Sequence, residues 1–172
     1  MADRIVILFE GKVQQIATPR ELYQCPSTVA IARFGGEAPM NILPVALQQD
    51  NGHLDVELAG QRFPAPARLR EIVNGNQVGS EVLLGVRPSD VDLTWSERSG
   101  AVRGELYAVE QHGKTAHITA QVGEHLIEVA VRTDAEMAVG DPLWLSVEES
   151  PIYVFDASTN QLVAAAGVDG ED

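Results

Sequence analysis

Residues 81–93, with the sequence EVLLGVRPSDVDL, decide how the rest of this chain is expected to fold. The run 81–86 is apolar and rich in residues that favour β-structure, so it predicts a buried strand. Gly85 lies inside that run, where a glycine is typical of a bulge or of a close backbone approach. Arg87 precedes Pro88, and a residue before proline is restricted to extended geometry. The stretch therefore predicts a stiff corner between two strands, with an arginine held on it.

The arginine at this corner has two interpretations. In the first, Arg87 is structural and pairs with a carboxylate or with backbone carbonyls. In the second, Arg87 contacts a partner or senses a ligand, as residues on exposed corners often do. The spacing of the residues alone favours the structural interpretation.

The composition bounds the class of protein. The chain has 172 residues, of which 45% are hydrophobic and 22% charged, so it is expected to fold around one ordinary core or two small ones. The net charge of −13 argues against nucleic acid and anionic membranes as partners. No apolar run approaches the ~20 residues of a membrane-spanning helix, and the first residues do not have the pattern of a signal peptide. The single cysteine, Cys25, excludes an internal disulfide and indicates a reducing compartment.

The charge is unevenly distributed along the chain. Residues 1–40 hold four basic and four acidic side chains, and residues 41–172 hold eight basic and twenty-one acidic ones. The whole net charge therefore lies beyond residue 40, which indicates two parts with different surroundings.

The first part is predicted to contain a hairpin and two short helices. Residues 4–9 and 12–16 are expected to pair as strands. Thr18 then has the position of an N-cap in a capping box, and Ser27 is expected to cap a second helix that stops at Gly35 and Gly36. Elements this small bury little apolar surface, so residues 1–36 are expected to need a larger body to pack against.

The second part has the pattern of a mainly β fold. Short apolar runs separated by turn signals suit one or two small OB-like barrels, with residues 94–100 as the crossing point and a helical turn or two near 66–73. The end of the chain, from Ala164 onward, is small and acidic and is expected to be disordered. The predicted strands are 42–47, 53–58, 61–63, 81–86, 101–109, 115–122, 125–131, 143–147, 152–155 and 161–164.

The sequence contains no convincing catalytic constellation. No phosphate-binding loop of the form GxxxxGK[ST] occurs, so the chain is not expected to hydrolyse a nucleotide. His112, His117 and His125 lie close in sequence, but strand alternation is expected to leave His117 in solvent, and no metal site is predicted. No nucleophile and base converge either, so an independent enzyme is not supported.

Two groups of motifs carry a resemblance to a known family. The first comprises MADRIV (1–6), EGKVQQ (10–15), TPRELY (18–23), Pro26, Val29-Ala30, Phe34-Gly35 and Met40-Asn41, and the second comprises LGVRP (84–88) and IYVFD (152–156). Together they resemble the last part of the ATP-binding subunit of bacterial ABC importers of the maltose, glycerol-3-phosphate and polyamine group. The second group resembles landmarks of its accessory β domain, called TOBE or MOP-like. The resemblance covers nearly the whole chain.

The resemblance implies an organisation in three parts. Residues 1–40 would be the end of a nucleotide-binding domain, residues 41–166 the accessory TOBE or OB-like domain, and residues 167–172 a disordered tail. Met1 would correspond to an internal position of the family pattern. The family's signature motif, Walker B acids and switch histidine are not found in this sequence. ATP and magnesium would therefore belong to the full-length parent, and no cofactor is expected here.

The resemblance also implies a role and partners. The chain would be a non-catalytic dimerisation and regulatory domain of an importer ATPase, with sugar or glycerol phosphate as the favoured cargo. Its partners would be a second copy, a nucleotide-binding domain, membrane permease subunits through the parent, and a regulatory protein or small ligand, but no nucleic acid. Its location would be cytoplasmic, at the inner membrane through the parent. The expected contact surface comprises Arg87, Pro88, Phe155 and Asp156.

An alternative is a small-ligand-binding β domain of a polyamine, iron or oxyanion importer. Its ligand would be an oxyanion or a sugar. An anion would need a local cluster of arginines to overcome the negative field of the chain. The candidates for that cluster are Arg87, Arg103 and Arg132.

Overall fold

The structure, a computed structural model, describes residues 3–36, 38–112, 115–132 and 137–168. The prediction of a mainly β chain is confirmed, and most strands lie within three residues of their expected bounds. Within the described residues the elements are β1 (Ile5–Phe9), β2 (Lys12–Ala17), α1 (Pro19–Gln24), α2 (Val29–Phe34), β3 (Asn41–Asp50), β4 (His53–Leu58), β5 (Gln61–Pro64), α3 (Ala67–Gly75), β6 (Glu81–Val86), the 3-10 helix η1 (Pro88–Asp90), β7 (Asp92–Thr94), β8 (Val102–His112), β9 (Thr115–Val122), β10 (His125–Arg132), β11 (Pro142–Ser146), β12 (Ile152–Asp156) and β13 (Leu162–Ala166).

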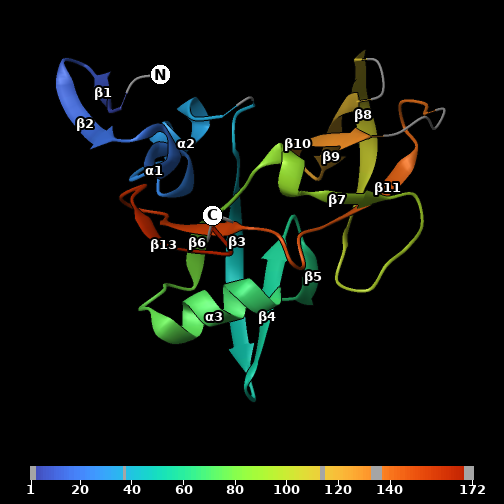
Figure 1. Cartoon of the computed structure of the whole chain (residues 1–172). Coiled ribbons are helices and arrows are strands. Elements are labelled where there is room, and N and C mark those ends of the chain that lie inside the picture. The colour runs from blue at the N-terminus through green and yellow to red at the C-terminus, as the bar shows by residue number, and fades with distance from the viewer. Residues whose placement is uncertain (1–2, 37, 113–114, 133–136, 169–172) are drawn as a thin grey trace.

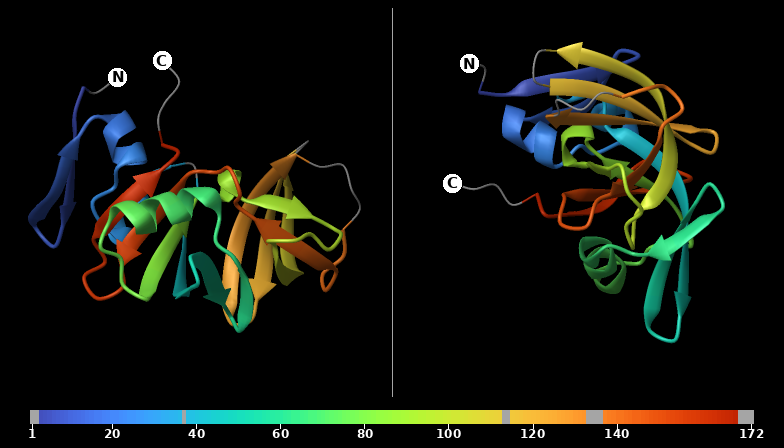
Figure 2. Two further views of the ribbon diagram at one scale, coloured as in Figure 1. Left: turned by 90° about the horizontal axis from the view of Figure 1, so that it is seen from below. Right: turned by 90° about the vertical axis from the view of Figure 1, so that its right-hand side faces the viewer.

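The strands form three antiparallel sheets. β1 and β2 make a hairpin, six strands pair in the order β13-β12-β6-β3-β4-β5, and five pair in the order β10-β9-β8-β11-β7. Figure 2 (left) shows the hairpin at one end, the six-stranded sheet with α3 in the middle, and the five-stranded sheet at the other end. The corner after β6 leads directly from the middle sheet into the five-stranded sheet.

The chain crosses between the large sheets at a different place from the one expected. The prediction placed the crossing at residues 94–100, but β7 (Asp92–Thr94) already pairs with β11 in the five-stranded sheet. The crossing is therefore the corner at residues 87–91. The chain returns after β11, and β12 pairs with β6. Strand order along the sequence could not reveal this return, because sheet membership is decided by pairing between distant segments.

One hydrophobic core extends across both large sheets. It joins Leu84 and Val86 of the six-stranded sheet to Leu106, Ile118 and Val129 of the five-stranded sheet in a single cluster of buried side chains. The two sheets are thus packed on each other and do not enclose two separate cores. Burying a side chain of this size contributes about 1.5–3 kcal/mol, so the shared core is a major source of stability for both sheets.

The N-terminal segment, defined here as residues 3–36, has its own small core. Ile7, Ala17, Leu22 and Ile31 are buried together, separately from the large cluster. The capping box at Thr18 is confirmed: Glu21 N–H donates to Thr18 Oγ1 at 3.2 Å, and Thr18 N–H donates to Glu21 Oε2 at 2.8 Å. Its small core leaves the segment dependent on its attachment to the sheets.

The cap of α2 needs a correction. Thr28, and not Ser27, is its N-cap, and its side chain accepts a hydrogen bond from Ile31 N–H. The N–H of Ser27 instead donates to Gln15 Oε1 at 2.9 Å, and Thr28 forms an isolated β-bridge with Gln161. These contacts hold Thr28 in the extended backbone conformation that an N-cap requires.

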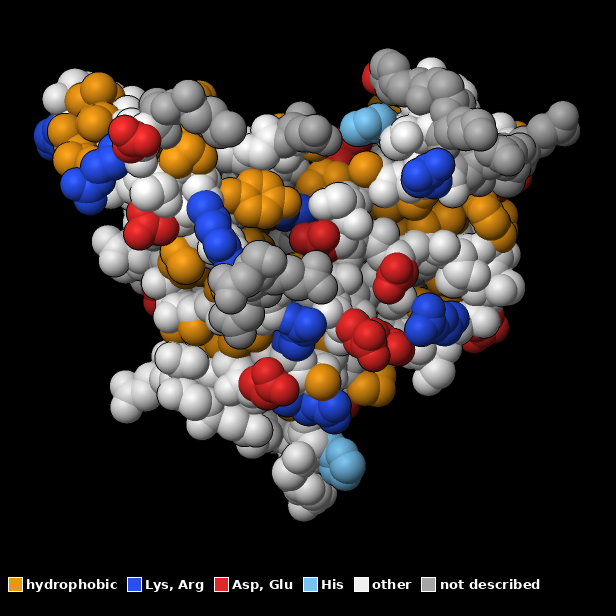
Figure 3. Space-filling model, in the orientation of Figure 1, with side chains coloured by type: hydrophobic (Ala, Val, Ile, Leu, Met, Phe, Trp, Pro, Cys, Tyr) orange, Lys and Arg blue, Asp and Glu red, His pale blue; other side chains and the backbone are white. Residues whose placement is uncertain are grey.

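One face of the hairpin is apolar and uncovered. Val6, Leu8, Val13 and Ile16 are each between 48% and 57% exposed, although all are large hydrophobic residues. We call these four side chains the hairpin face. Val6 pairs with Ile16 and Leu8 with Val13 across the two strands, so the four side chains lie together. Figure 3 shows the hydrophobic surface at the corner of the molecule that the hairpin occupies.

The end of the chain is more ordered than expected. The small and acidic composition predicts disorder from Ala164 onward, but Ala164–Ala166 belong to β13, where Ala164 pairs with Val154 and Ala166 with Ile152 of β12. Alanine has little strand preference of its own, so the pairing with β12 creates this strand. Val168 lies near α1, and its carbonyl accepts a hydrogen bond from Gln24 Nε2 at 2.8 Å. Residues 169–172 lie outside the described part.

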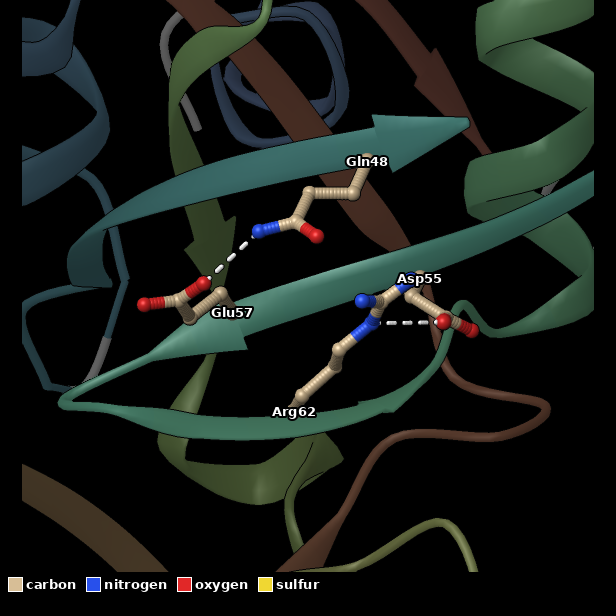
Figure 4. A network of polar contacts seen from close by, with 4 residues as sticks. All are labelled: Gln48, Asp55, Glu57 and Arg62. Carbon is tan, nitrogen blue, oxygen red and sulfur yellow. Dashed lines mark hydrogen bonds and ion pairs between the residues drawn. The ribbon is translucent and has the colours of Figure 1, made fainter. Parts of the chain in front are cut away.

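Polar side chains brace the outer strands of the six-stranded sheet. Gln48 Nε2 of β3 donates to Glu57 Oε2 of β4 at 2.8 Å, and Arg62 Nε of β5 donates to Asp55 Oδ2 of β4 at 2.8 Å (Figure 4). Such cross-strand pairs stabilise a sheet by tenths of a kcal/mol, to about 1 kcal/mol each. They set the register of β4 and β5 without forming a site.

Among the described helices, none combines the length and the apolar character that crossing a membrane would require.

Candidate functional site: the Arg87 seam

The corner after β6 places an arginine inside the molecule. Val86 ends the buried strand, Arg87 is extended with φ −75° and ψ 148°, and Pro88 begins η1. The proline fixes the direction in which the chain leaves the strand. Arg87 is only 2% exposed and is the one charged side chain classed as buried in the part of the chain that the structure describes.

The guanidinium of Arg87 binds the N-terminal segment. Nη1 donates to the carbonyl of Gly35 at 2.9 Å, and Nη2 donates to the carbonyl of Tyr23. The guanidinium carbon lies 3.5 Å from the centre of the Tyr23 ring, a stacking cation–π contact. Tyr153 adds a second contact, because its hydroxyl donates to the same Tyr23 carbonyl at 3.4 Å. We call Tyr23, Gly35, Arg87 and Tyr153 the Arg87 seam.

These contacts bear on the two interpretations of Arg87. The arginine pairs with backbone carbonyls, as the structural interpretation predicts. The sequence could not identify the partners, since Gly35 and Tyr23 lie 52 and 64 residues away. Their positions follow from the packing of the N-terminal segment onto the sheets.

Within the part of the chain that the structure describes, the charge of Arg87 has no ionic partner. Among the described residues no carboxylate lies within ion-pair distance of it, and its Nε is buried without a hydrogen-bond partner. The nearest acid along the chain is Asp90, at the end of η1. Burial raises the pKa of the Asp90 carboxyl, against the hydrogen bond from Ser89 and the charge of Arg87. Burial also raises the pKa of the Tyr153 hydroxyl. Arg87 and Asp90 are thus a cation and an acid three residues apart, and they form no ion pair with each other.

A tight apolar layer lies under the corner. Met40, Tyr153 and Phe155 are buried in one cluster with Ala32 of α2. A Cβ added to Gly85 would lie 2.7 Å from Met40 Sδ and 2.8 Å from Phe155 Cε2. The close approach predicted for Gly85 is thus confirmed, and it explains why no larger residue fits there.

Asp156 organises the turn between β12 and β13. Its Oδ1 accepts hydrogen bonds from the backbone N–H groups of Ser158 and Thr159, at 2.9 and 2.7 Å, and from both hydroxyls. The hydrogen bonds from Ser158 and Thr159 lower the pKa of the Asp156 carboxyl to about 2. The turn between β12 and β13 also contacts the start of α2, where Val29 N–H donates to Asn160 O at 3.0 Å.

The residues expected to form a contact surface lie mostly in the interior. Arg87, Pro88 and Phe155 are buried, and Asp156 is half-buried. An internal structural role is the one that these positions support, and the interface role assigned to the four residues stays a prediction. Because the contacts that bury them come from distant segments, the sequence pattern could not separate an interior corner from a surface one.

The candidate anion contacts are not brought together. Arg87 lines a hollow with Tyr23, and Arg132 lines another with Trp95. Arg103 lines a third, beside Gln61. No three His, Cys, Asp or Glu side chains in the described residues form a metal-binding group, and the side chain of His112 lies outside them.

Two amide side chains that the sequence analysis did not single out join the sheets. Asn41 at the start of β3 exchanges two hydrogen bonds with the backbone of Glu128 in β10, both 2.8 Å long. Gln61 of β5 does the same with Arg103 of β8, at 2.8 and 2.9 Å. A side-chain amide has the same donor and acceptor as a peptide group. Each amide therefore binds the backbone N–H and carbonyl of its partner residue as a neighbouring strand would. No local pattern marks these residues, because their partners are distant.

Two family models match the chain, and their overlap falls on the corner. One, described as the MalK OB fold domain, matches residues 39–91, and the other, described as the TOBE domain, matches residues 84–155. This chain carries the OB-fold and TOBE domains of the ABC transporter ATP-binding subunits. The residues shared by the two matches, 84–91, include Arg87, so the seam lies where the OB-fold and TOBE matches meet.

Curated relatives of these domains agree with the match. The chain is 30% identical to an uncharacterized ABC transporter ATP-binding protein, y4oS, of Sinorhizobium fredii, over 95% of this chain and 42% of that protein. It is 30% identical to the sn-glycerol-3-phosphate import ATP-binding protein UgpC of Ralstonia nicotianae, over 96% of this chain and 45% of that protein. It is 27% identical to UgpC of Escherichia coli K12, over 95% of this chain and 44% of that protein. This chain thus spans less than half the length of these relatives.

A solved structure with the same fold supports the domain assignment. The cytoplasmic molybdate-binding protein ModG, in a crystal form with molybdate bound, superimposes with a TM-score of 0.50 and 17% identity. The similarity covers 66% of this chain and 94% of ModG. At that identity the similarity shows only that this chain and ModG share a fold.

Proposed function

We propose that this chain is the non-catalytic regulatory and dimerisation module of an ABC importer ATPase subunit. The observation that carries the proposal is the uncovered hairpin face next to a well-packed β body. The four side chains of that face are about half exposed, whereas the core residues of both sheets are buried. An apolar face of this kind is typical of a surface that another protein body covers.

The proposed cover is a nucleotide-binding domain. The matched relatives carry the name of ATP-binding proteins and are more than twice as long as this chain. The N-terminal segment would complete that domain, and the Arg87 seam would join it to the OB-fold and TOBE sheets. ATP and magnesium would bind in the neighbouring domain, and permease subunits would contact the assembled transporter at the cytoplasmic face of the inner membrane.

The proposed cargo is a sugar or a glycerol phosphate. Several relatives are named sn-glycerol-3-phosphate import ATP-binding protein, including those from Ralstonia nicotianae and Escherichia coli. The cargo would not touch this chain, because the proposed role is to regulate the ATPase.

The experiment that tests the role joins this chain to the part of Escherichia coli UgpC that precedes the matched region. We expect the fusion to be soluble and to hydrolyse ATP, and the 172-residue chain alone to show no ATP turnover. The control fusion carries Leu8→Asp and Val13→Asp on the hairpin face, and it should lose solubility or activity because charges would be buried against the neighbour. ATP hydrolysis by the chain alone would overturn the proposal.

Self-association needs its own measurement. Sedimentation velocity of the chain over a hundredfold range of concentration should show a monomer–dimer equilibrium. A single monomeric species at all concentrations would leave the regulatory role without its dimerisation part. The Leu8→Asp, Val13→Asp variant in parallel tells whether any dimer uses the hairpin face or the β body.

A second candidate function is binding of a small oxyanion. The similarity in fold to ModG, whose structure holds molybdate, favours it. The separate positions of Arg87, Arg103 and Arg132 argue against a site made of all three. Thermal unfolding with molybdate, sulfate or phosphate tests it, because a ligand at a hundred times its Kd adds about 2.7 kcal/mol of stability. No shift with any of these anions would exclude this function.

A further inference from the structure

A pair of glycines stands where the N-terminal segment joins the sheets. Gly35 and Gly36 directly follow α2, and the OB-fold match begins shortly after them, at residue 39. The change in charge at residue 40 places a boundary in the same region. Two glycines at such a boundary have the backbone freedom of a hinge. The contacts around them therefore decide whether the N-terminal segment can move independently of the sheets.

Arg87 holds both glycines in place. Its Nη1 donates to the Gly35 carbonyl at 2.9 Å, and a Cβ added to Gly36 would lie 3.0 Å from the same Nη1 atom. Met40, at the far end of the connection, is 2% exposed and is buried in one cluster with Tyr153. A hinge absorbs changes in backbone angles, and this connection is fixed at both of its ends.

Ala32 supplies a second attachment, which is apolar. It is 1% exposed and is buried in one cluster with Tyr153 and Phe155 of β12. Ile31, the residue before it, is buried in the separate small core of the N-terminal segment. Consecutive residues of α2 thus lie in two different cores. The helix cannot turn against the sheet without exposing apolar surface to water, which is unfavourable.

Backbone hydrogen bonds form a third attachment, at the turn between β12 and β13. Val29 N–H donates to Asn160 O, and Leu162 N–H donates to Ser27 O, both at 3.0 Å. Figure 1 shows α1 and α2 beside β13, where these bonds lie. The N-terminal segment is therefore fastened at three places by three kinds of contact, and it moves against the sheets only when one or more of them breaks.

We propose that the N-terminal segment is a fixed arm of the OB-fold and TOBE sheets, and that Gly35 and Gly36 do not act as a hinge. The inference goes beyond the proposed function, because it holds whichever protein covers the hairpin face. The boundary for motion is then the hairpin face and not the region near residue 40. A partner that displaces the hairpin would move β6 and β12 with it, and through the corner at Arg87 it would also move the five-stranded sheet.

The test is hydrogen exchange of single amides, measured by NMR on the whole chain. Val29 and Leu162 report on the junction, because their N–H groups donate across it. Ala32, whose N–H donates to the Thr28 carbonyl, reports on α2 itself. In a fixed arm the junction opens only when α2 unfolds, so the protection factors of the three amides should agree within about tenfold. Protection more than tenfold lower at Val29 and Leu162 than at Ala32 would mean a hinge and would overturn the proposal.

Arg87→Lys gives the second arm of the test. It keeps the charge and removes the guanidinium fork, which weakens the junction. In a fixed arm the amides of Val29, Leu162 and Ala32 should all exchange about tenfold faster, the factor expected for one lost hydrogen bond to a charged group. Faster exchange at the two junction amides alone would contradict the fixed arm. Arg62→Lys, at the exposed ion pair with Asp55, is the matched control and should leave all three rates unchanged.

A geometric measurement on the wild type needs no variant. Residual dipolar couplings of the amides in α1 and α2, and of those in β6 and β12, should fit a single alignment tensor, because a fixed arm tumbles with the sheets. Two tensors of different magnitude would overturn the proposal, also if Arg87→Lys does not fold.

Discussion

Asn41 and Glu128, 87 residues apart, are joined by a closed pair of hydrogen bonds. Asn41 Nδ2 donates to the Glu128 carbonyl, and the Glu128 N–H donates to Asn41 Oδ1, both at 2.8 Å. Asn41 belongs to the six-stranded sheet and Glu128 to β10, an edge strand of the five-stranded sheet. A single side chain thus satisfies backbone groups of an edge strand and links the two sheets.

Removing this amide should destabilise the chain. Asn41→Ala leaves the N–H and carbonyl of Glu128 without partners in a half-buried place, at a cost of about 1–3 kcal/mol in the free energy of unfolding. Gln61→Ala, at the exposed contact with Arg103, should cost less, because water replaces the lost partners. Urea unfolding measures both. Gln49→Ala, on an exposed residue of β3, is the control and should have no measurable effect. Equal costs for Asn41→Ala and Gln61→Ala would contradict the role of burial.

The layer under the corner should not tolerate a methyl group. Gly85→Ala would place a Cβ 2.7 Å from Met40 Sδ, so side chains or backbone must shift, at about 1–3 kcal/mol. Gly75→Ala is the matched control, because a Cβ at Gly75 meets no atom within 4 Å and the residue lies in α3. That change should be neutral or stabilising. Thermal unfolding of the two variants would show the contrast, and similar melting temperatures would refute the close packing.

The turn at Asp156 should make stability depend on pH in acid. The pKa of this carboxyl in the folded chain is about 2, below its ordinary value of 3.8. A group with a depressed folded pKa stabilises the fold above its unfolded pKa, and that contribution is lost as the pH falls through the folded pKa. The difference in unfolding free energy between the wild type and Asp156→Asn should therefore rise between about pH 2 and 4 and stay level above. If the difference in unfolding free energy does not depend on pH, the ionised carboxylate of Asp156 does not stabilise the turn.

The two faces of the hairpin should respond differently to the same change. Leu8 is 57% exposed and Ile7 only 6%, although they are neighbours. Leu8→Lys should change the free energy of unfolding by less than about 0.5 kcal/mol and should lower the binding of a hydrophobic dye. Ile7→Lys should unfold the N-terminal segment, because it buries an unpaired charge. Far-UV circular dichroism and dye fluorescence measure both effects. A large stability loss in Leu8→Lys would mean that the hairpin face is already covered in the isolated chain.

Local structure could be predicted from the residues because its causes lie within a few positions. The capping box at Thr18 needs only Thr18 and Glu21, which are one turn apart. The strand before Arg87 follows from a continuous apolar run, and the crowding at Gly85 follows from a glycine in that run. The motifs at 84–88 and 152–156 indicate the ABC importer family for the same reason: they are short and contiguous. The TOBE match, over residues 84–155, covers the first motif and all but the last residue of the second.

What the amino-acid sequence determined by itself was the class of the chain: β strands, an arginine on a corner, and an N-terminal segment with too little apolar surface to be buried alone. The tertiary structure decided the partners. β12 and β13 return to the six-stranded sheet, Ala164–Ala166 become a strand by pairing, and Arg87 reaches the carbonyls of Tyr23 and Gly35. The physical reason is range: helix caps and strand preferences act between near neighbours, whereas sheet order and the burial of a charge depend on surfaces that meet only when the whole chain has packed.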